Sequence, residues 1–403
     1  MLRRVVVTGI GMINALGFDK ESSFKRICDG ESGVGKITLF DATDFPVTIA
    51  AEVKDFDPLS VTDAKEVKKV DRFILLGLKA AQEAFEDANF KDLELDDFGV
   101  SSAAGIGGLP NIEKNSMTCS QRGPRKVSPF FIPSALVNML GGIVAIKHGL
   151  KGPNLSSVTA CAAGTHAICE ATKTIMIGSA KKMLVVGAES AICPVGIAGF
   201  AAMKALSTRN DDPKTASRPF DSGRDGFVMG EGAGALILED YEDAVARGAK
   251  IYAEIIGFGE SCDANHITAP TVDGPKRAIL KALKMANNPK LDYINAHGTS
   301  TPTNDRNETL VVKDIFKDQI PPMTSTKGQI GHCLGAAGAI EAVICLMAMQ
   351  KNIIPPTINQ FQKDEDCDLD YICKAKNADL NIVMSNSFGF GGTNGSIIFK
   401  KVK

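Results

Sequence analysis

The sequence predicts an α/β fold in which helices pack against sheets. Short runs rich in Val, Ile and Leu alternate with helical patterns along the whole chain, and this alternation is typical of sheets covered by helices. No linker interrupts the pattern. The 403 residues, 44% of them hydrophobic, are sufficient for a large core, and the length is that of roughly two or three domain-sized units.

Strands are expected where branched apolar residues cluster near glycine. The clearest runs are residues 4–8, 98–103, 155–159 and 183–187. A helix is expected over residues 73–88, because apolar side chains recur there on one face behind Asp71, a suitable N-cap. A second apolar stripe at helical spacing begins at Leu334 and ends at Met347. We expect both stripes to face the core.

A weak internal repeat indicates that the fold has two similar halves. Residues 156–167 read S-S-V-T-A-C-A-A-G-T-H-A, and residues 324–339 read T-S-T-K-G-Q-I-G-H-C-L-G-A-A-G-A. Each is the end of a strand that runs into a helix opening with small residues, and each is followed by a second strand. Strand–turn–helix units resemble one another in any α/β protein, so the residues alone leave duplication open. We place the boundary near residue 250, which gives halves at 1–250 and 251–403.

Composition argues against several classes of protein. The 45 basic and 47 acidic side chains nearly cancel, so no global field favours nucleic acid or a membrane surface. The ten cysteines include no C-x-x-C pair, and we expect reduced thiols in the cytoplasm. The N-terminus shows no signal-peptide pattern. The longest apolar stretch, residues 339–349, contains Glu341 and is about half the ~20 residues that a membrane span requires.

Cys161 is a candidate nucleophile. It follows an expected strand and precedes Ala162, Ala163 and Gly164 at the start of a helix predicted to end near Ile177. A helix N-terminus favours thiolate over thiol, and small neighbours leave room for a substrate. The alternative is a buried structural cysteine, which is the interpretation that suits most of the other nine.

Two of the five histidines lie in glycine-rich junctions. His297 ends an apolar run and should lie at the carboxyl end of a strand, where open α/β sheets bind ligands. His332 lies in G-Q-I-G-H-C-L-G-A-A-G-A, five residues after Lys327. A lone histidine is more often a satisfied hydrogen-bonding residue, so this alternative stays open for each. We expect no metal at the pair, because no third ligand stands at a recognisable spacing.

Two glycine-rich segments could bind an anion. Residues 386–395 read N-S-F-G-F-G-G-T-N-G and lack the Lys-Ser/Thr ending of a P-loop, so they are expected to present backbone N–H groups to an oxyanion. Residues 9–14 approximate a dinucleotide fingerprint, with Asn14 where the third glycine belongs. No acidic strand end follows at the required distance of about twenty residues, so nicotinamide binding is not expected.

Together these segments resemble the β-ketoacyl-[acyl-carrier-protein] synthases of fatty-acid synthesis, specifically the elongating branch of the type II system. The resemblance covers essentially the whole chain. The segments that carry it are T-A-C-A-A-G around Cys161, N-A-H-G-T-S-T-P around His297, S-T-K-G-Q-I-G-H with Lys327 and His332, and N-S-F-G-F-G-G-T-N-G around Phe390. The family has a thiolase-like, internally duplicated α-β-α-β-α sandwich of five layers. The resemblance therefore implies that fold and supports the repeat.

The resemblance also implies a reaction, a decarboxylative Claisen condensation catalysed by an acyltransferase. Cys161 would accept an acyl group from acyl carrier protein, and the backbone N–H groups of Cys161 and Phe390 would form an oxyanion hole. His297 and His332 would stabilise the enolate formed when malonyl-carrier protein loses carbon dioxide, and the product would be a β-ketoacyl-carrier protein two carbons longer. Lys327 would orient His332 and set the local charge, with Glu341 bracing the same network.

Substrate contacts follow from the same resemblance. Thr299 and Thr301 match threonines that bind the phosphopantetheine arm. Ile106, Phe131 and Phe200 resemble positions that line the acyl tunnel, and Phe390 resembles its gatekeeper. A bulky residue at Ile106 is similar to the long-chain type, so we expect medium to long acyl chains.

The partners that the resemblance implies are acyl carrier protein and a second copy of the chain. The carrier is strongly acidic, and the matching basic positions are Lys65, Lys68, Lys69, Arg125, Lys126 and Lys204. Exposed, solvated basic side chains would look the same. The acyl tunnel would reach the homodimer interface near Phe131. No cofactor is expected, since phosphopantetheine arrives on the substrate, and neither nucleic acid nor membrane is expected as a partner.

The departures from the family pattern are small, and the rival functions are few. Ala162 and Ala163 stand where family members vary, and Arg306 stands where many carry a small or apolar residue. Another thiolase-like enzyme is one rival, but thiolases pair a histidine with a second cysteine, and initiating synthases use His and Asn. A cysteine hydrolase would need only Cys161 and His297. A non-catalytic chain-length subunit typically lacks the cysteine.

Overall fold

The computed structural model describes residues 2–91 and 94–402, and ten strands in these residues form one mixed sheet. In order across the sheet they are β10 (Met323–Thr324), β9 (Tyr293–Asn295), β13 (Ile382–Gly389), β14 (Thr393–Lys400), β8 (Ala253–Cys262), β1 (Val5–Ile13), β7 (Gly232–Asp240), β6 (Lys182–Glu189), β4 (Phe98–Ala103) and β5 (Asn154–Ser157). Strands β1 and β8 share only a short contact, at Val6 and Val7. This contact separates two sets of five strands.

The two sets have the same strand order and the same directions. In the first, β1 pairs antiparallel with β7, β7 antiparallel with β6, β6 parallel with β4, and β4 parallel with β5. In the second, β8, β14, β13, β9 and β10 repeat this series of directions. The predicted duplicated fold is confirmed.

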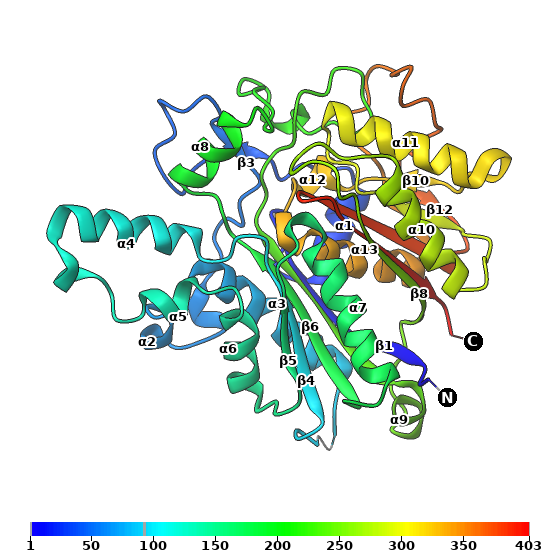
Figure 1. The fold of residues 1–403 in the computed structure, drawn as a ribbon, viewed down its shortest axis with the longest axis horizontal. Helices are drawn as coiled ribbons and strands as arrows, with labels where there is room; N and C mark the ends of the chain where they lie inside the picture. Colours follow the sequence, from blue (N-terminus) through cyan, green and yellow to red (C-terminus); the bar gives the residue numbers. More distant parts are fainter. Residues whose placement is uncertain (1, 92–93, 403) are drawn as a thin grey trace.

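Helices form three layers around and between the two sets of strands (Figure 1). On one outer side, α3 (Arg72–Ala88) packs on β1, β7 and β6, and on the other, α10 (Asp273–Met285) packs on β8 and β14 beside α11 (Pro302–Phe316). Between them, α7 (Ala163–Met176) packs on β4 and β6, and α13 (Ala337–Lys351) packs on β7 and β13. The central pair of helices therefore touches both sets of strands.

Glycines let the outer helices approach the strands closely. A Cβ on Gly9 or Gly11 of β1 would lie 2.3 or 2.1 Å from a carbonyl oxygen of α3, and a Cβ on Gly257 or Gly259 of β8 would lie 2.4 or 2.0 Å from one of α10. The approximate dinucleotide fingerprint is therefore strand β1, and its first two glycines make room for a helix.

The predicted elements agree with the structure except near two glycine-rich segments. Strand β4 has the expected bounds, and α3 begins after Asp71, whose side chain accepts the N–H of Phe73. Strand β1 continues to Ile13, and most of the expected loop at 386–395 belongs to the hairpin of β13 and β14. In β1 the glycines serve close packing against α3, so the strand runs beyond the expected end at residue 8.

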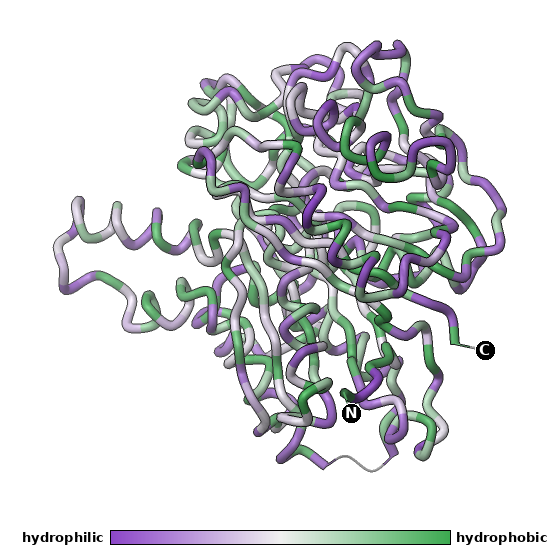
Figure 2. The backbone as a smooth tube through the Cα atoms, turned by 45° about the vertical axis from the view of Figure 1, so that its right-hand side comes forward, coloured by the Kyte–Doolittle hydropathy of each residue, from purple (hydrophilic) through white to green (hydrophobic). Residues whose placement is uncertain are grey.

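The remaining elements surround this framework. The helices are α1 (Lys20–Cys28), α2 (Ala64–Val67), α4 (Leu109–Arg122), α5 (Phe131–Ala135), α6 (Met139–His148), α8 (Pro194–Ala202), α9 (Tyr241–Ala246) and α12 (Lys327–Ile330). Two small sheets pair β2 (Gly35–Lys36) with β3 (Ile49–Ala50) and β11 (Ile353–Ile354) with β12 (Lys376–Asn377). Helices α4 and α5 form an arm that stands away from the body (Figure 1 and Figure 2).

One segment of the described residues is long and apolar enough to span a membrane, Leu334–Lys351. It consists of α13 and the turn before it, and 89% of the window is buried. Its position between the two sets of strands makes it a core helix.

Candidate active site

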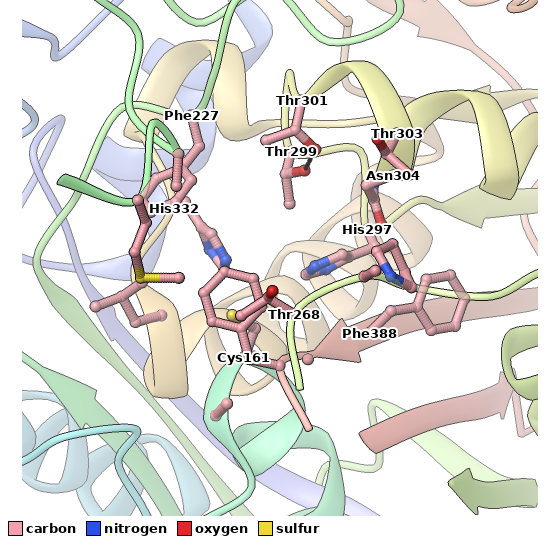
Figure 3. Close-up of a pocket in the computed structure, with 18 of the residues that line it drawn as sticks. Cys161, Phe227, Thr268, His297, Thr299, Thr301, Thr303, Asn304, His332 and Phe388 are labelled. Carbon is pink, nitrogen blue, oxygen red and sulfur yellow. Dashed lines mark hydrogen bonds between the residues drawn. The ribbon is translucent and has the colours of Figure 1, made fainter. Parts of the chain in front are cut away.

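A cavity of about 510 Å³ brings the three main candidate residues together. Cys161, His297 and His332 all line it. The sulfur of Cys161 and one ring nitrogen of each histidine lie within 4.8 Å of one another. In Figure 3 the ring nitrogens of both histidines face the space beside Cys161, and Thr299 and Thr301 lie across that space. Segments from both halves of the sequence thus build one site.

Cys161 is held in a tight turn between β5 and α7. It lies in a 3₁₀ turn, Ala160–Ala162, and Ala160 has a φ of 50°, a left-handed conformation that is strained for alanine. The carbonyl oxygen of Thr159 accepts the Thr393 hydroxyl at 2.9 Å, which ties this turn to the start of β14. The turn aims the sulfur into the cavity just before the helix begins.

His297 follows β9, at the carboxyl end of a parallel strand as predicted. Its backbone N–H and that of Gly298 each donate to the Glu308 carboxylate at 2.9 Å. Its ring meets the rings of His332 and Phe388 edge to face, with centroids 5.4 and 5.7 Å away. Glu308 and these rings fix the orientation of the imidazole.

His332 lies between α12 and α13 and is fixed by its backbone. Its N–H donates to the carbonyl of Val228 at 2.8 Å, and its own carbonyl accepts the N–H of Gly230 at 2.9 Å. The ring of Phe227 packs edge-on against its imidazole, with centroids 5.2 Å apart. Because hydrogen bonds hold the backbone of His332 at both its N–H and its carbonyl, its ring can move only by rotation about the side-chain bonds.

Lys327 joins the two histidine segments, although not in the way the sequence suggested. Its ammonium group donates to the carbonyl of His297 at 2.6 Å and forms a buried ion pair with Glu341 of α13. We expected Lys327 to orient His332, but its hydrogen bonds in the structure go to His297 and Glu341. Its charge contributes to the lowered pKa of the His332 ring.

The backbone N–H groups of Cys161 and Phe390 lie near the sulfur of Cys161. Both act to lower the pKa of its thiol. A Cβ on Gly389 would lie 3.1 Å from the Cys161 nitrogen, so the glycine allows the β13–β14 hairpin to approach the nucleophile. This pair of amides has the arrangement of an oxyanion hole.

Most of the expected substrate contacts also line the cavity. Thr299 and Thr301 lie there with their hydroxyl oxygens 2.9 Å apart, and Ile106, Phe200 and Phe390 form other parts of the wall. Phe131 does not line it, because it lies on α5 at the base of the protruding arm. The tunnel position expected for Phe131 is thus not found within this chain.

Of the six expected docking residues, one lines the cavity and five do not. Lys204 lines the cavity itself. Lys65 lies on α2, with Lys68 and Lys69 just after it, and Lys69 forms an ion pair with Glu66 and lies 5.5 Å from the ring of Phe130 on the arm. Arg125 and Lys126 are exposed between α4 and α5.

Sequence reasoning missed several residues of the site. Glu308 is fully buried beneath His297 and lay unrecognised within the segment N-D-R-N-E after Pro302. The segment from Asp263 to Pro270 also contributes to the cavity wall, and no motif pointed to it. Glu308 could have been found from its spacing on the helix after His297, whereas the wall segment carried no signal.

Comparison with known proteins assigns the family. Residues 2–244 match the family described as Beta-ketoacyl synthase, N-terminal domain, and residues 252–361 match Beta-ketoacyl synthase, C-terminal domain. A protein of Coxiella burnetii named 3-oxoacyl-[acyl-carrier-protein] synthase 2 is 49% identical over 99% of both chains, and one of Synechocystis with the same name is 48% identical over 99% of this chain and 98% of its own. The chain belongs to the β-ketoacyl synthase family.

Solved structures agree with this assignment. A chain from a type II PKS acyl-carrier protein in complex with its ketosynthase bound to the hexaketide superposes with a TM-score of 0.92, at 33% identity and over 100% of both chains. The family and the geometry together make this chain a condensing enzyme of the acyltransferase class.

In this β-ketoacyl synthase site, the pKa of the Cys161 thiol differs from the one we expected. Burial raises the pKa of Cys161 to about 12, although the Lys327 charge and the two backbone N–H groups act in the opposite direction. We expected the helix N-terminus to favour thiolate. Desolvation is the larger effect, so the resting sulfur is a thiol and needs a base when it attacks.

Both histidines are held neutral at physiological pH. Burial lowers the pKa of His297 and of His332 well below the usual value, and the Lys327 charge adds to the effect. A neutral imidazole can donate one N–H into the cavity, or accept the proton of the thiol. The buried carboxyl groups have the opposite shift, since burial raises the pKa of Glu308 and of Glu341 to about 7.

The same three side chains could in principle bind a metal ion. The sequence argument against a metal rested on the lack of a third ligand, but the structure brings Cys161 to both histidines. A tetrahedral zinc site has ligand bonds of about 2.0–2.3 Å, so side chains up to 4.8 Å apart would have to move closer together. The trio fits an organic substrate between its members better than a resident ion.

Proposed function

We propose that this chain elongates acyl groups by condensing an acyl thioester on Cys161 with malonyl-acyl carrier protein. The observation that carries this proposal is the grouping of one thiol and two neutral imidazoles within 4.8 Å, where the β13–β14 hairpin approaches the Cys161 nitrogen. A hydrolase would need one imidazole, while decarboxylative condensation uses both. The relatives named 3-oxoacyl-[acyl-carrier-protein] synthase 2 support the same reaction.

In the first half-reaction Cys161 takes the acyl group. The thiol gives its proton to a neutral imidazole of the site, the sulfur attacks the carrier thioester, and the carrier thiol leaves with that proton. The N–H groups of Cys161 and Phe390 stabilise the tetrahedral oxyanion. Because the resting thiol has a raised pKa, transfer of its proton to the imidazole is part of the barrier to loading.

In the second half-reaction the malonyl thioester loses carbon dioxide. The electron pair of the breaking carbon–carbon bond forms an enolate, whose oxygen accepts N–H donors from His297 and His332. The enolate carbon then attacks the acyl carbonyl, a new carbon–carbon bond forms, and the sulfur of Cys161 leaves as a thiolate. The thiolate takes up a proton from solvent, because its original proton left with the first carrier thiol. Neutral imidazoles suit this role, because each keeps one N–H without carrying a charge into the buried site.

Substrate contacts follow from the cavity wall. Thr299 and Thr301 would hydrogen-bond the phosphopantetheine arm, and Ile106 and Phe200 would contact the acyl chain, with Phe390 at the gate. Lys327 and Glu341 would hold the His297 segment in place through the buried ion pair. We further propose that medium to long acyl chains are preferred.

The carrier partner would dock on the basic positions around the entrance. Lys65, Lys68, Arg125 and Lys126 are exposed, and Lys204 stands at the cavity itself. Such charges steer an acidic partner more than they tighten the complex. Charge reversal at Lys65 and Lys68 should raise the KM for the carrier severalfold and leave decarboxylation of a small malonyl thioester unchanged.

A homodimer is proposed from an unpaired strand edge. β5 ends the sheet and is exposed or half-buried along its length; Leu155 is 44% exposed, and Val158, just after the strand, is 52% exposed. Nearby, Ile146 of α6 is 79% exposed, and the arm presents Ile132. Pairing of β5 with its copy would cover this edge. Phe131 could then reach the tunnel of the partner.

We further propose a division of labour between the two halves of the chain. Residues 1–250 would form the half that carries the nucleophile, and residues 251–403 the half that carries the histidines. The reaction as written draws on no cofactor held by the chain, because the carrier thioester supplies both the leaving group and the nucleophilic carbon. The enzyme would work in the cytoplasm, where acyl carrier protein is found.

The deciding experiment measures the intact mass of the protein after incubation with a saturated acyl-carrier protein, before and after malonyl-carrier protein is added. A gain of one acyl group that requires Cys161, followed by release as a β-ketoacyl chain two carbons longer, is expected. Release as a free acid with malonyl intact would instead establish the hydrolase. Metal analysis of the active protein tests the absence of a resident ion.

A further inference from the structure

The duplicated fold contains a second copy of the site around the nucleophile. At the centre, a Cβ on Gly164 of α7 would lie 2.5 Å from the Ala339 nitrogen, and a Cβ on Gly338 of α13 would lie 2.5 Å from the Thr165 nitrogen. This reciprocal contact makes Gly164 and Gly338 equivalent. Three residues before them stand Cys161 and Gly335, which are therefore counterparts.

The strands beside these two turns are also counterparts. β6 and β13 are eight residues long and end at Glu189 and Gly389, respectively. Gly389 lies against the Cys161 nitrogen and adds no side chain there. Glu189 places its carboxylate on the Gly335 N–H at 3.0 Å. Where the first copy leaves a backbone N–H free for a substrate oxyanion, the second copy fills the equivalent place with an anion of its own.

Glu189 has the surroundings of a bound anion. It is fully buried, and besides Gly335 it accepts the backbone N–H groups of Gly105, of Ile106 at 3.2 Å and of Gly107 at 2.9 Å. Successive N–H groups that converge in this way form an anion-binding nest. Hydrogen bonds to a charged acceptor are about twice as strong as neutral ones.

These hydrogen bonds join two walls of the cavity. Ile106 forms part of one wall, and Leu334, the neighbour of Gly335, forms part of another. The two backbones are in direct contact, because a Cβ on Gly335 would lie 1.9 Å from the Gly105 nitrogen. The Glu189 carboxylate is the common acceptor that fixes their separation, and hence the position of the Ile106 side chain.

We propose that Glu189 is a positioning residue, an internal anion in the second copy of the oxyanion hole that sets the shape of the acyl pocket and so the range of acyl chains the enzyme accepts. The inference rests on the proposed function, since it concerns the pocket for the acyl group on Cys161. Glu189 touches no reacting atom in this account. Its charge contributes to the raised pKa of Cys161 for every substrate alike, and its effect on chain length acts through Ile106 and Leu334.

The test compares Glu189→Gln with Glu239→Gln across acyl-carrier substrates of short, medium and long chains. Glu239 is a matched control, because it is equally buried and accepts charged hydrogen bonds from Arg247, but at the opposite end of the sheet. The substitution replaces one carboxylate oxygen of Glu189, which accepts hydrogen bonds, with an NH2 group, which donates them. This NH2 group would face backbone N–H groups that are also donors. We expect Glu189→Gln to lower kcat/KM for long chains roughly tenfold, equivalent to about 1.4 kcal/mol, with short chains changed about twofold at most.

A rescue experiment separates the anion from the side chain that carries it. Glu189→Gly leaves the nest empty, and formate at high concentration should restore part of the long-chain activity, whereas chloride at the same ionic strength should not. Glu189→Asp keeps an anion on a shorter stem and should give an intermediate profile. This last variant preserves a test if the glycine variant fails to fold.

The outcomes separate this inference from the proposed function. If the unmodified protein does not load acyl groups on Cys161, the proposed function fails. If it loads them, but Glu189→Gln changes all chain lengths equally or no more than Glu239→Gln, the positioning role is wrong. A folded Glu189→Gly variant that formate does not restore would contradict the part of the proposal that concerns the anion.

Discussion

Helices α7 and α13 cross at the centre of the molecule, and each begins after a residue of positive φ, Ala160 at 50° and Leu334 at 45°. The connections into them differ. Residues 158–162 join β5 directly to α7, whereas the longer stretch 325–336 joins β10 to α13 and includes α12. The same arrangement of strand and helix is therefore used twice, with connecting segments of different length and composition.

The difference shows how a duplicated fold divides its chemistry. The short connection carries Cys161, the proposed nucleophile, whose counterpart is Gly335. The longer one carries Lys327 and His332, which have no counterparts. Three residues beyond the glycine contact, α13 has the buried Glu341 where α7 has Ala167. In the proposed mechanism, one copy supplies the acyl acceptor, and the other supplies a charge and an imidazole beside it.

The largest effect is expected when Cys161 is replaced by glycine, the residue that stands at the equivalent position 335 of the second copy. Cys161→Gly should abolish acyl loading, a loss of at least about a thousandfold in kcat/KM, because no other nucleophile faces the oxyanion hole. Decarboxylation of malonyl-carrier protein should persist, since both histidines remain. Intact mass and carbon dioxide release measure the two steps.

The matched control for this change is Cys169→Ala. Cys169 is a fully buried cysteine on the same helix, α7, but does not line the cavity. The Cys169→Ala protein should load acyl groups at the normal rate, once any loss of folded protein is corrected for. Acyl transfer by the Cys161→Gly protein, at any site, would show that the nucleophile has been misassigned.

Removing the imidazole of the longer connection should affect the other step. His332→Ala is expected to lower decarboxylation by about a hundredfold to a thousandfold, the usual cost of removing one oxyanion donor. The acyl-enzyme should still form, more slowly if His332 is the base for the thiol. Single-turnover loading and malonyl decarboxylation separate these effects, and equal losses in both would contradict a role specific to the enolate.

A smaller effect is expected where the hairpin meets the nucleophile. Gly389→Ala would place a Cβ 2.7 Å from the Thr393 hydroxyl and 3.1 Å from the Cys161 nitrogen. This should shift the oxyanion hole and slow loading roughly tenfold to a hundredfold. Gly391→Ala is the control, since no atom lies within 4 Å of its added Cβ, although its φ of 80° adds strain. Equal rates for the two variants would remove the argument for close approach.

The sequence predicted the motifs well because they are local. Cys161 and His297 each follow a strand, and His332 lies in a glycine-rich segment before a helix, so local patterns placed all three. Sequence reasoning could not place Glu189, whose partners are backbone N–H groups brought from distant segments. It also assigned the wrong direction to the pKa of Cys161, because the desolvation of a cavity wall depends on tertiary packing that no local pattern encodes.

The smallest expected effect concerns the acidic residue that only the second helix carries. Burial raises the pKa of Glu341 from 4.5 to about 7. Between these values the folded chain keeps a proton that the unfolded chain has released, so Glu341 makes the free energy of unfolding fall as pH rises through this window and level off above it. Glu341→Gln should remove that slope, about 1 kcal/mol per pH unit. Denaturant unfolding from about pH 5 to 8 measures the free energy of unfolding of the variant and of the unmodified protein. The difference between the two isolates the contribution of Glu341 from those of Glu308 and the histidines. Glu86→Gln on the exposed face of α3 should change nothing, and parallel curves for all three proteins would mean that Glu341 stays ionised beside Lys327 throughout.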